Sequence, residues 1–181
     1  MNRLAVFAFV LMWAGLMTLA VAAPPPPNGP STGGQVDFGG FRNLSEEVQA
    51  YRANRLVSHA QFEAMARQPG TIILDARSAS AYRMGHIAGA INLSLTDFTA
   101  QSLAATIPNP NTRILIYCNN NFSGAPGPFP TKLPSASLNL STFAALYDYG
   151  YRNVYELRPL LDARTTRIAF AGSLAAAVRV R

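Results

Sequence analysis

The sequence has few of the residues that form disulfide bonds or bind metal ions. Its 181 residues include one cysteine, two histidines and a single lysine, Lys132. One cysteine cannot form an internal disulfide, and no Cys/His cluster has the spacing of metal ligands. The formal net charge is +6, but the arginines are scattered and form no basic run interleaved with aromatic residues. The composition therefore argues against a disulfide scaffold, a metal site and a nucleic-acid partner.

The start of the chain predicts export. A short segment with one positive charge is followed by a long uncharged apolar stretch, and Ala20 and Ala22 form an A-x-A site before a proline run. This pattern predicts a signal peptide over residues 1–22 that is cleaved after Ala22. We therefore expect a periplasmic or secreted protein with no stable membrane span after cleavage. The alternative is an N-terminal membrane anchor, because the apolar stretch approaches the length of a membrane span.

The two ends of the mature chain differ from its middle. Residues 23–40 are rich in proline and glycine and predict an extended tether. Residues 163–181 carry four arginines and no acid, which predicts a basic C-terminal tail. We expect this tail to be either a short alanine-rich helix packed on the domain or a frayed end, and its apolar residues favour partial order.

The middle of the chain predicts one α/β domain over residues 41–162. From residue 58 to residue 157, strand and helix patterns alternate. Such alternation is typical of a mainly parallel sheet flanked by helices on both faces. We expect the strands at the runs TIILD, GAINL, RILIY and NVYEL.

Capping residues predict where the helices begin. Ser45, followed by two acids, indicates the start of a first helix. Ser58 and Gln61 match a capping box at the start of a second helix. A later helix is expected to begin at Ser94 or Thr96.

Cys118 follows RILIY, the most apolar of the expected strands. In an open α/β sheet, ligands bind at the carboxyl ends of the strands. Backbone N–H groups and the dipole of a following helix would favour a thiolate at this position. We therefore expect Cys118 to be accessible and reactive. The alternative is a buried structural cysteine.

Three separated motifs resemble the rhodanese-like domain family. The first is ILDARSASAYRMGHIAGAINL, with Asp75-x-Arg77 followed by Gly85-His86-Ile87-x-Gly89. The second is RILIYC, and the third is YGYRNVYEL. The resemblance covers residues 55–162 and implies a sulfurtransferase fold in which the cysteine carries a persulfide.

Most of the first motif is expected to be structural. Asp75 and Arg77 should pair at the end of a strand, because a buried charge without a partner is costly. Gly85 and Gly89 would permit tight turns. We do not expect His86 to act as a base, because a persulfide cycle needs no proton transfer there.

The loop after the cysteine departs from the family pattern because it has no cation. We expect its backbone amides to hold an anionic persulfide, and Phe122 to form an apolar wall at the pocket mouth. Its residues after the cysteine are Asn119, Asn120, Asn121, Phe122 and Ser123. A proline-rich insertion, GAPGPFPTKLP, follows the loop and contains Lys132. The hypothesis is that the insertion folds back and brings the Lys132 ammonium to the pocket, against the alternative of a solvated surface lysine.

Two functions remain open at this point. The first is an exported sulfurtransferase that carries sulfane sulfur on Cys118, is not optimised for thiosulfate, and uses a small sulfur donor and a thiol acceptor without metal or organic cofactor. A protein partner is possible. The second is a catalytically inactive binding or redox-sensing module. A cysteine phosphatase is disfavoured, because Gly124 stands where its phosphate-binding arginine would lie.

Overall fold

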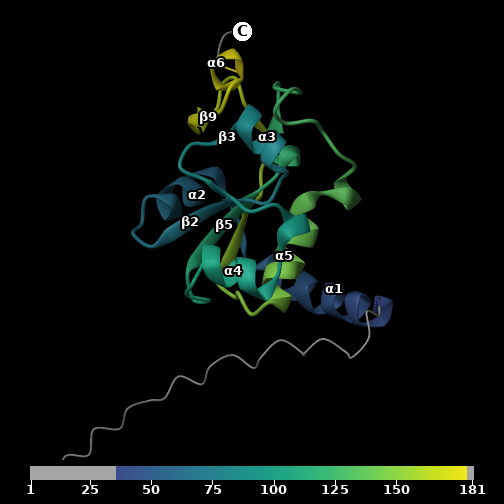
Figure 1. The fold of residues 1–181 in the computed structure, drawn as a ribbon. Coiled ribbons are helices and arrows are strands. Elements are labelled where there is room, and N and C mark those ends of the chain that lie inside the picture. The colour runs from purple at the N-terminus through teal and green to yellow at the C-terminus, as the bar shows by residue number, and fades with distance from the viewer. Residues whose placement is uncertain (1–35, 179–181) are drawn as a thin grey trace, which may run out of the picture.

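The computed structural model describes residues 36–178, so the predicted signal peptide and residues 23–35 of the predicted tether lie outside the described residues. Five parallel strands form the central sheet in the order β1-β7-β5-β2-β4 (Figure 1). These strands are β1 Leu56–Val57, β2 Thr71–Asp75, β4 Ile91–Asn92, β5 Arg113–Tyr117 and β7 Val154–Leu157. The four predicted strand runs are therefore confirmed, and the short edge strand β1 adds a fifth.

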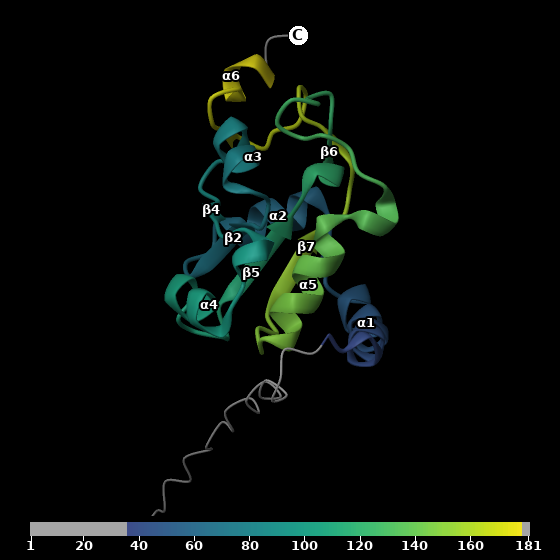
Figure 2. The ribbon, with the colours of Figure 1, turned by 45° about the vertical axis from the view of Figure 1, so that its right-hand side comes forward.

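Helices cover both faces of this sheet, as the sequence predicts. On one face lie α1 Phe38–Ala53, α4 Ala100–Thr106 and α5 Leu138–Asp148, while α2 His59–Ala66 lies on the other (Figure 2). The side chains of β5 alternate between the two cores: Leu115 and Tyr117 join the cluster beside α2, whereas Ile114 and Ile116 join the cluster beside α4 and α5. Because both faces are buried, the central strand is apolar throughout.

Two helix starts differ from the prediction. The first helix begins at Phe38, inside the expected tether, because the Asp37 side chain accepts a hydrogen bond from the Gly40 amide at 2.8 Å. Ser45 lies within this helix. Residues Leu95–Asp97 form a 3₁₀ turn (η1), and α4 begins after it with Thr99 as its N-cap. In both places a second residue of the capping type occurs nearby in the sequence, Asp37 before Ser45 and Thr99 after Thr96, and the sequence pattern alone did not distinguish between them.

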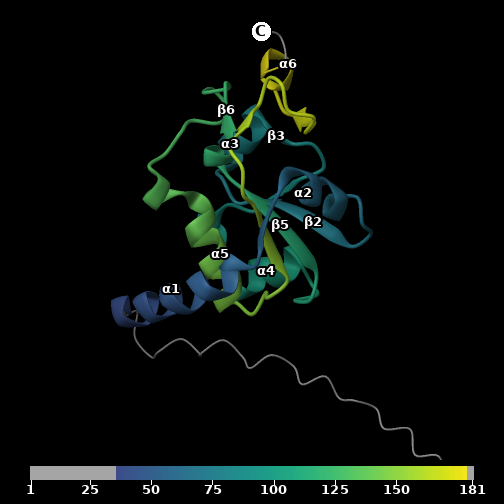
Figure 3. The same ribbon diagram turned by 180° about the vertical axis from the view of Figure 1, so that it is seen from behind.

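The C-terminal tail is part of the domain. Strand β9 Phe170–Ala171 pairs antiparallel with β3 His86–Ile87 (Figure 3). Ile168, which precedes β9, is buried. The domain therefore extends beyond residue 162. The alanine-rich helix is present but short, as α6 Ala175–Val178. Strand pairing, rather than a helical face, explains the partial order that the apolar residues predict.

Several short elements follow the long strands and complete the domain. Residues Asn119–Asn121 form a 3₁₀ turn, η2, and β6 Phe122–Ser123 then pairs in parallel with β8 Leu161–Asp162. The proline-rich insertion leads through a 3₁₀ turn (η3 Pro134–Ala136) into α5. The short helix α3 Ala79–Met84 lies between β2 and β3. Within residues 36–178, none of the helices combines the length and the apolar character needed to cross a membrane.

Candidate active site around Cys118

Cys118 directly follows β5 and lies at the carboxyl end of the sheet. It is 2% exposed, so the expectation of an openly accessible thiol is wrong for the static structure. Its side chain nevertheless borders a cavity of about 430 Å³. The Sγ atom lies 3.3 Å from the Oγ atom of Ser137, the residue that precedes α5. Cys118 is therefore sheltered from bulk solvent but borders a space large enough for a small reactant.

The three asparagines after Cys118 are held by different parts of the molecule. Asn119 Oδ1 accepts a hydrogen bond from Arg77 Nη1 at 3.2 Å. Asn120 forms two hydrogen bonds of 2.9 Å with the backbone of Lys132. Asn121 Oδ1 accepts from the Cys118 amide at 2.9 Å, and its Nδ2 donates to Leu157 O at 2.6 Å. Side-chain amides thus fix a loop that contains no glycine and no cation.

Two of the loop amides close the η2 turn. The Asn121 N–H donates to Cys118 O at 3.2 Å, and the Phe122 N–H donates to Asn119 O. The Asn121 N–H also points to the Cys118 side chain, in a capping box whose other half is the hydrogen bond from the Cys118 amide to the Asn121 side chain. One loop amide thus reaches the sulfur, whereas that of Phe122 is used within the turn. The ring of Phe122 is buried and packs against Tyr117 and Phe129, and the residue also lines the cavity. It therefore belongs both to the core and to the wall of the cavity.

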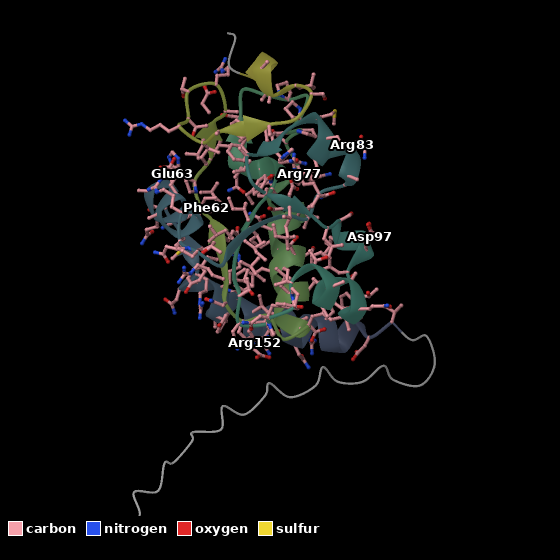
Figure 4. All side chains as sticks on the ribbon, turned by 60° about the vertical axis from the view of Figure 1, so that its left-hand side comes forward. Phe62, Glu63, Arg77, Arg83, Asp97 and Arg152 are labelled. Carbon is pink, nitrogen blue, oxygen red and sulfur yellow. The ribbon has the colours of Figure 1, made fainter. Side chains whose placement is uncertain are left out.

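Arg77 and Asp75 form the buried ion pair that the sequence predicts. Arg77 Nη2 lies 2.6 Å from Asp75 Oδ2, and the two side chains are 2% and 0% exposed. Arg77 also donates to Pro128 O at 2.8 Å and to Gly85 O at 2.6 Å, and it lies in the interior of the domain (Figure 4). One guanidinium therefore joins β2, the cysteine loop, the proline-rich insertion and the end of α3.

This ion pair also sets the chemistry of the neighbouring Tyr117. The Tyr117 hydroxyl donates to Asp75 Oδ2 at 2.6 Å and accepts from the Ile87 amide at 3.0 Å. Burial, followed by the negative charge of Asp75, raises the pKa of Tyr117 well above its ordinary value. Burial alone would lower the pKa of Arg77, but the hydrogen bonds and charge of Asp75 outweigh it and raise that pKa. The cluster therefore consists of the neutral Tyr117 hydroxyl and the charged pair of Asp75 and Arg77.

The remaining residues of the first motif are structural. His86 donates through Nδ1 to Tyr82 O at 2.7 Å, and its ring stacks on that of Tyr82 at 3.7 Å. Gly89 has φ +84°, which agrees with the predicted turn. Gly85 does not: its φ is −176°, an extended conformation that any residue adopts. It is small for another reason, because a Cβ atom there would lie 2.8 Å from the Cβ atom of Pro128.

The charged residues of the cavity come mostly from elements outside the loop. Arg52 on α1, Glu156 on β7 and Arg158 after β7 line it together with Lys132. The hydrogen bonds between Asn120 and the Lys132 backbone hold the insertion against the cysteine loop, as the fold-back part of the hypothesis expects. The approach of the Lys132 ammonium to Cys118 stays a prediction. The sequence reasoning missed the other three. The available signal was Glu156, an acid inside an otherwise apolar strand, which implies a buried partner.

Ser123 is the last of the predicted loop residues, and it borders the cavity beside β8. Ser137 and Asn139, at the start of α5, also line this cavity and were not predicted. Within the part of the chain that the structure describes, no three His, Cys, Asp or Glu side chains come together as potential metal ligands. The site is therefore a cysteine beside a cavity that is lined by both apolar and polar residues and carries charges of both signs.

Comparisons with known proteins agree with this architecture. A family model described as the rhodanese-like domain matches residues 58–159. The BH2092 protein from Bacillus halodurans has a similar structure, with a TM-score of 0.50 and 20% identity over 74% of this chain and 88% of that one.

Two further solved structures show weaker similarity. A rhodanese with anions from E. coli has a TM-score of 0.39 and 21% identity, over 57% of this chain and 99% of that one. The Alr3790 protein from Anabaena sp. has a TM-score of 0.45 and 19% identity, over 64% and 80% of the two chains. No curated protein matches the sequence. Because the family model covers more than half of the 181 residues, this chain belongs to the rhodanese-like domain family.

Proposed function

We propose that this protein is an exported sulfurtransferase that carries sulfane sulfur as a persulfide on Cys118. The observation that carries the proposal is the position of Cys118, which follows the central strand at its carboxyl end and borders a cavity of about 430 Å³. The Ser137 hydroxyl, 3.3 Å from the sulfur, can donate a hydrogen bond to a thiolate or a persulfide.

The reaction needs two displacements at sulfur. The Cys118 thiolate attacks the outer sulfur of a donor persulfide or polysulfide, a new S–S bond forms, and the donor leaves as a thiolate. An acceptor thiolate then attacks the outer sulfur on Cys118, takes it as its own persulfide, and returns Cys118 to the thiolate form. No net oxidation occurs, and neither step requires a metal or organic cofactor.

The loop after Cys118 supports a donor other than thiosulfate, because it has no cation. The charged residues that line the cavity come from other elements. Arg52 offsets the negative charge of Glu156 through their ion pair, which leaves Arg158 and Lys132 to attract an anionic reactant. A small persulfide or polysulfide as donor and a thiol as acceptor are therefore the proposed reactants.

A second function is favoured by a different observation. Cys118 is 2% exposed, which suits a rhodanese fold kept as a binding or redox-sensing module. In that case the cavity would hold a ligand or remain closed to sulfur donors. The two functions predict opposite results when the native protein meets a reactive sulfur compound.

Intact-mass analysis of the purified native protein before and after treatment with inorganic polysulfide tests the proposal. We expect Cys118 to gain the mass of one sulfur atom and to lose it again when a small thiol is added. A Cys118→Ser variant should gain nothing. If the native protein gains no mass while the urea-denatured protein does, Cys118 is a structural cysteine and the second function is favoured. The starting mass also tests export, because cleavage after Ala22 would remove residues 1–22.

A further inference from the structure

We propose that Arg52 is a positioning residue for Cys118 and that it acts through a buried relay of Glu156, Asn139 and Asn121. The role of Arg52 in catalysis rests on the proposed sulfur transfer. The relay itself does not rest on it, because each link is a hydrogen bond or an ion pair between described residues.

The first link is a bidentate ion pair. Arg52 Nε lies 2.5 Å from Glu156 Oε2, and Arg52 Nη2 lies 2.7 Å from Glu156 Oε1. The Glu156 side chain is 8% exposed and that of Arg52 is 24% exposed. A carboxylate that is nearly buried needs a partner, and the planar guanidinium binds both of its oxygens. Arg52 therefore neutralises Glu156 and fixes its orientation.

The second link passes from Glu156 to the cysteine loop. Asn139 Nδ2 donates to Glu156 Oε1 at 3.2 Å and to Asn121 Oδ1 at 3.1 Å. Asn121 Oδ1 in turn accepts the Cys118 amide at 2.9 Å. Asn121 and Asn139 are buried, so these hydrogen bonds are shielded from water. The orientation of Glu156 thus determines that of the amide group that holds the backbone of Cys118.

Arg52 comes from an element that precedes the family match. That match starts at residue 58, whereas α1 ends at Ala53. The helix is attached beside α5 through buried Val48 and through Tyr51, whose hydroxyl donates to Arg152 O at 2.7 Å (Figure 2). The site around Cys118 is therefore completed by a helix that the matched domain does not include.

The relay also controls the charge that Cys118 experiences. Among the described residues that line the cavity, the charged groups are Arg52 from α1, Lys132 from the insertion, Glu156 from β7 and Arg158 after β7. Glu156 is the one carboxylate of that set. Without Arg52, its negative charge would be unpaired in the same cavity as the thiolate, and like charges disfavour ionisation. Arg52 thereby allows a buried carboxylate to orient the loop without suppressing the nucleophile.

Titration of the thiolate by its ultraviolet absorbance tests this inference. Each variant is compared with its own Cys118→Ser counterpart, so that the tyrosine signal cancels. We expect Arg52→Met to raise the pH midpoint of Cys118 ionisation by about one unit, and Glu156→Gln to lower it. Adding Glu156→Gln to Arg52→Met should return the midpoint toward the wild-type value. Arg52→Lys keeps the positive charge, so its midpoint should stay close to that of the wild type.

Arg42→Met is the matched control. Arg42 lies on the same helix, is exposed, and forms no side-chain hydrogen bond or ion pair with the residues that the structure describes. Arg42→Met removes the same charge as Arg52→Met. Because Arg42 has no contact with the relay, the pH midpoint of Cys118 ionisation in this variant should equal that of the wild type. At a pH below the midpoints, Arg52→Met should also accept sulfur from polysulfide about tenfold more slowly, because the thiolate is the nucleophile.

The outcomes separate this inference from the proposed function. Equal midpoints for Arg52→Met and Arg42→Met, or no recovery in the double variant, would overturn the role of Arg52. If Arg52→Met does not fold, Glu156→Gln alone must lower the midpoint, and an unchanged midpoint is then decisive against the relay. If the wild type never accepts sulfur, the proposed transfer fails while the titration still decides whether Arg52 acts on Cys118.

Discussion

Two arginine–carboxylate pairs hold the cysteine loop from opposite ends, and they differ in almost every other respect. Arg77 and Asp75 are two positions apart, lie inside the family match and are almost fully buried. Arg52 and Glu156 are 104 positions apart, and Arg52 precedes the match and keeps contact with water. The first pair reaches the loop at Asn119, and the second reaches it at Asn121.

The difference suggests that the two pairs have different roles at the same loop. Arg77 donates to three backbone or side-chain partners besides Asp75 and lies 4.6 Å from the centroid of the Phe129 ring. Its loss would disturb several segments at once. Arg52 has Glu156 as its hydrogen-bonding partner and acts on the loop through that residue. We therefore expect the first pair to control stability and the second to control the reactivity of Cys118.

The largest effect is expected for Arg77→Met. The change leaves the Asp75 carboxylate, which is 0% exposed, without a counter-charge. Removing one partner of a buried pair costs about 3–5 kcal/mol in the free energy of unfolding. Urea denaturation should show this loss. Adding Asp75→Asn should recover part of it, because the unpaired charge is then gone. A loss below that of Arg52→Met would invalidate the comparison.

A smaller loss is expected for Arg52→Met. The pair is still partly solvated, since Arg52 is 24% exposed, and water can replace some of the lost hydrogen bonds. We expect the free energy of unfolding to fall by about 1–2 kcal/mol. The same denaturation experiment measures it, with Arg42→Met as the control that should leave stability unchanged. A loss as large as that of Arg77→Met would show that both pairs are structural anchors.

The smallest effect is expected at an exposed pair, Arg164 and Asp162, whose side chains are 44% and 30% exposed. The side-chain hydrogen bond from Arg164, followed by its backbone N–H, lowers the pKa of Asp162 to about 2. Because the folded-state pKa is lower than the unfolded one, the pair stabilises the fold above pH ~4. That contribution is lost as the pH falls through about 2.

Arg164→Met should therefore change the melting temperature only slightly at neutral pH, since salt and water screen exposed pairs. Melting curves across the acidic range should show the wild type and the variant converging as the pH approaches that of Asp162 protonation. A gap that persists in strong acid would mean that Arg164 stabilises the domain by packing instead of charge.

Local patterns predicted most of the sheet and part of the site. The runs TIILD and RILIY became β2 and β5 because short apolar runs between turn residues form buried strands. The Ser58–Gln61 capping box is present, since both of its hydrogen bonds lie within one turn. The Asp75–Arg77 pair was equally predictable, because its members are neighbours at the end of one strand.

Contacts between distant segments were not predictable from such patterns. Phe122 lies four positions after Cys118, yet its ring packs in the core because Phe129 and Phe170 come from the insertion and the tail to meet it. Gly85 looked like a turn glycine, but its space is limited by Pro128. Ser137 reaches the sulfur only because the insertion returns the chain to the end of β5 before α5 begins.

The sequence by itself determined the alternation of strands and helices, the position of Cys118 after the central strand and the absence of a cation from its loop, because each depends on residues that are close along the chain. Only the tertiary structure decided which charges surround the sulfur. Arg52, Glu156 and Arg158 share a cavity with Cys118 because the parallel order of β5 and β7 and the packing of α1 beside α5 bring them together. The ion pair of Arg52 and Glu156 joins residues 104 positions apart, so it depends on that packing and cannot be inferred from a local sequence pattern.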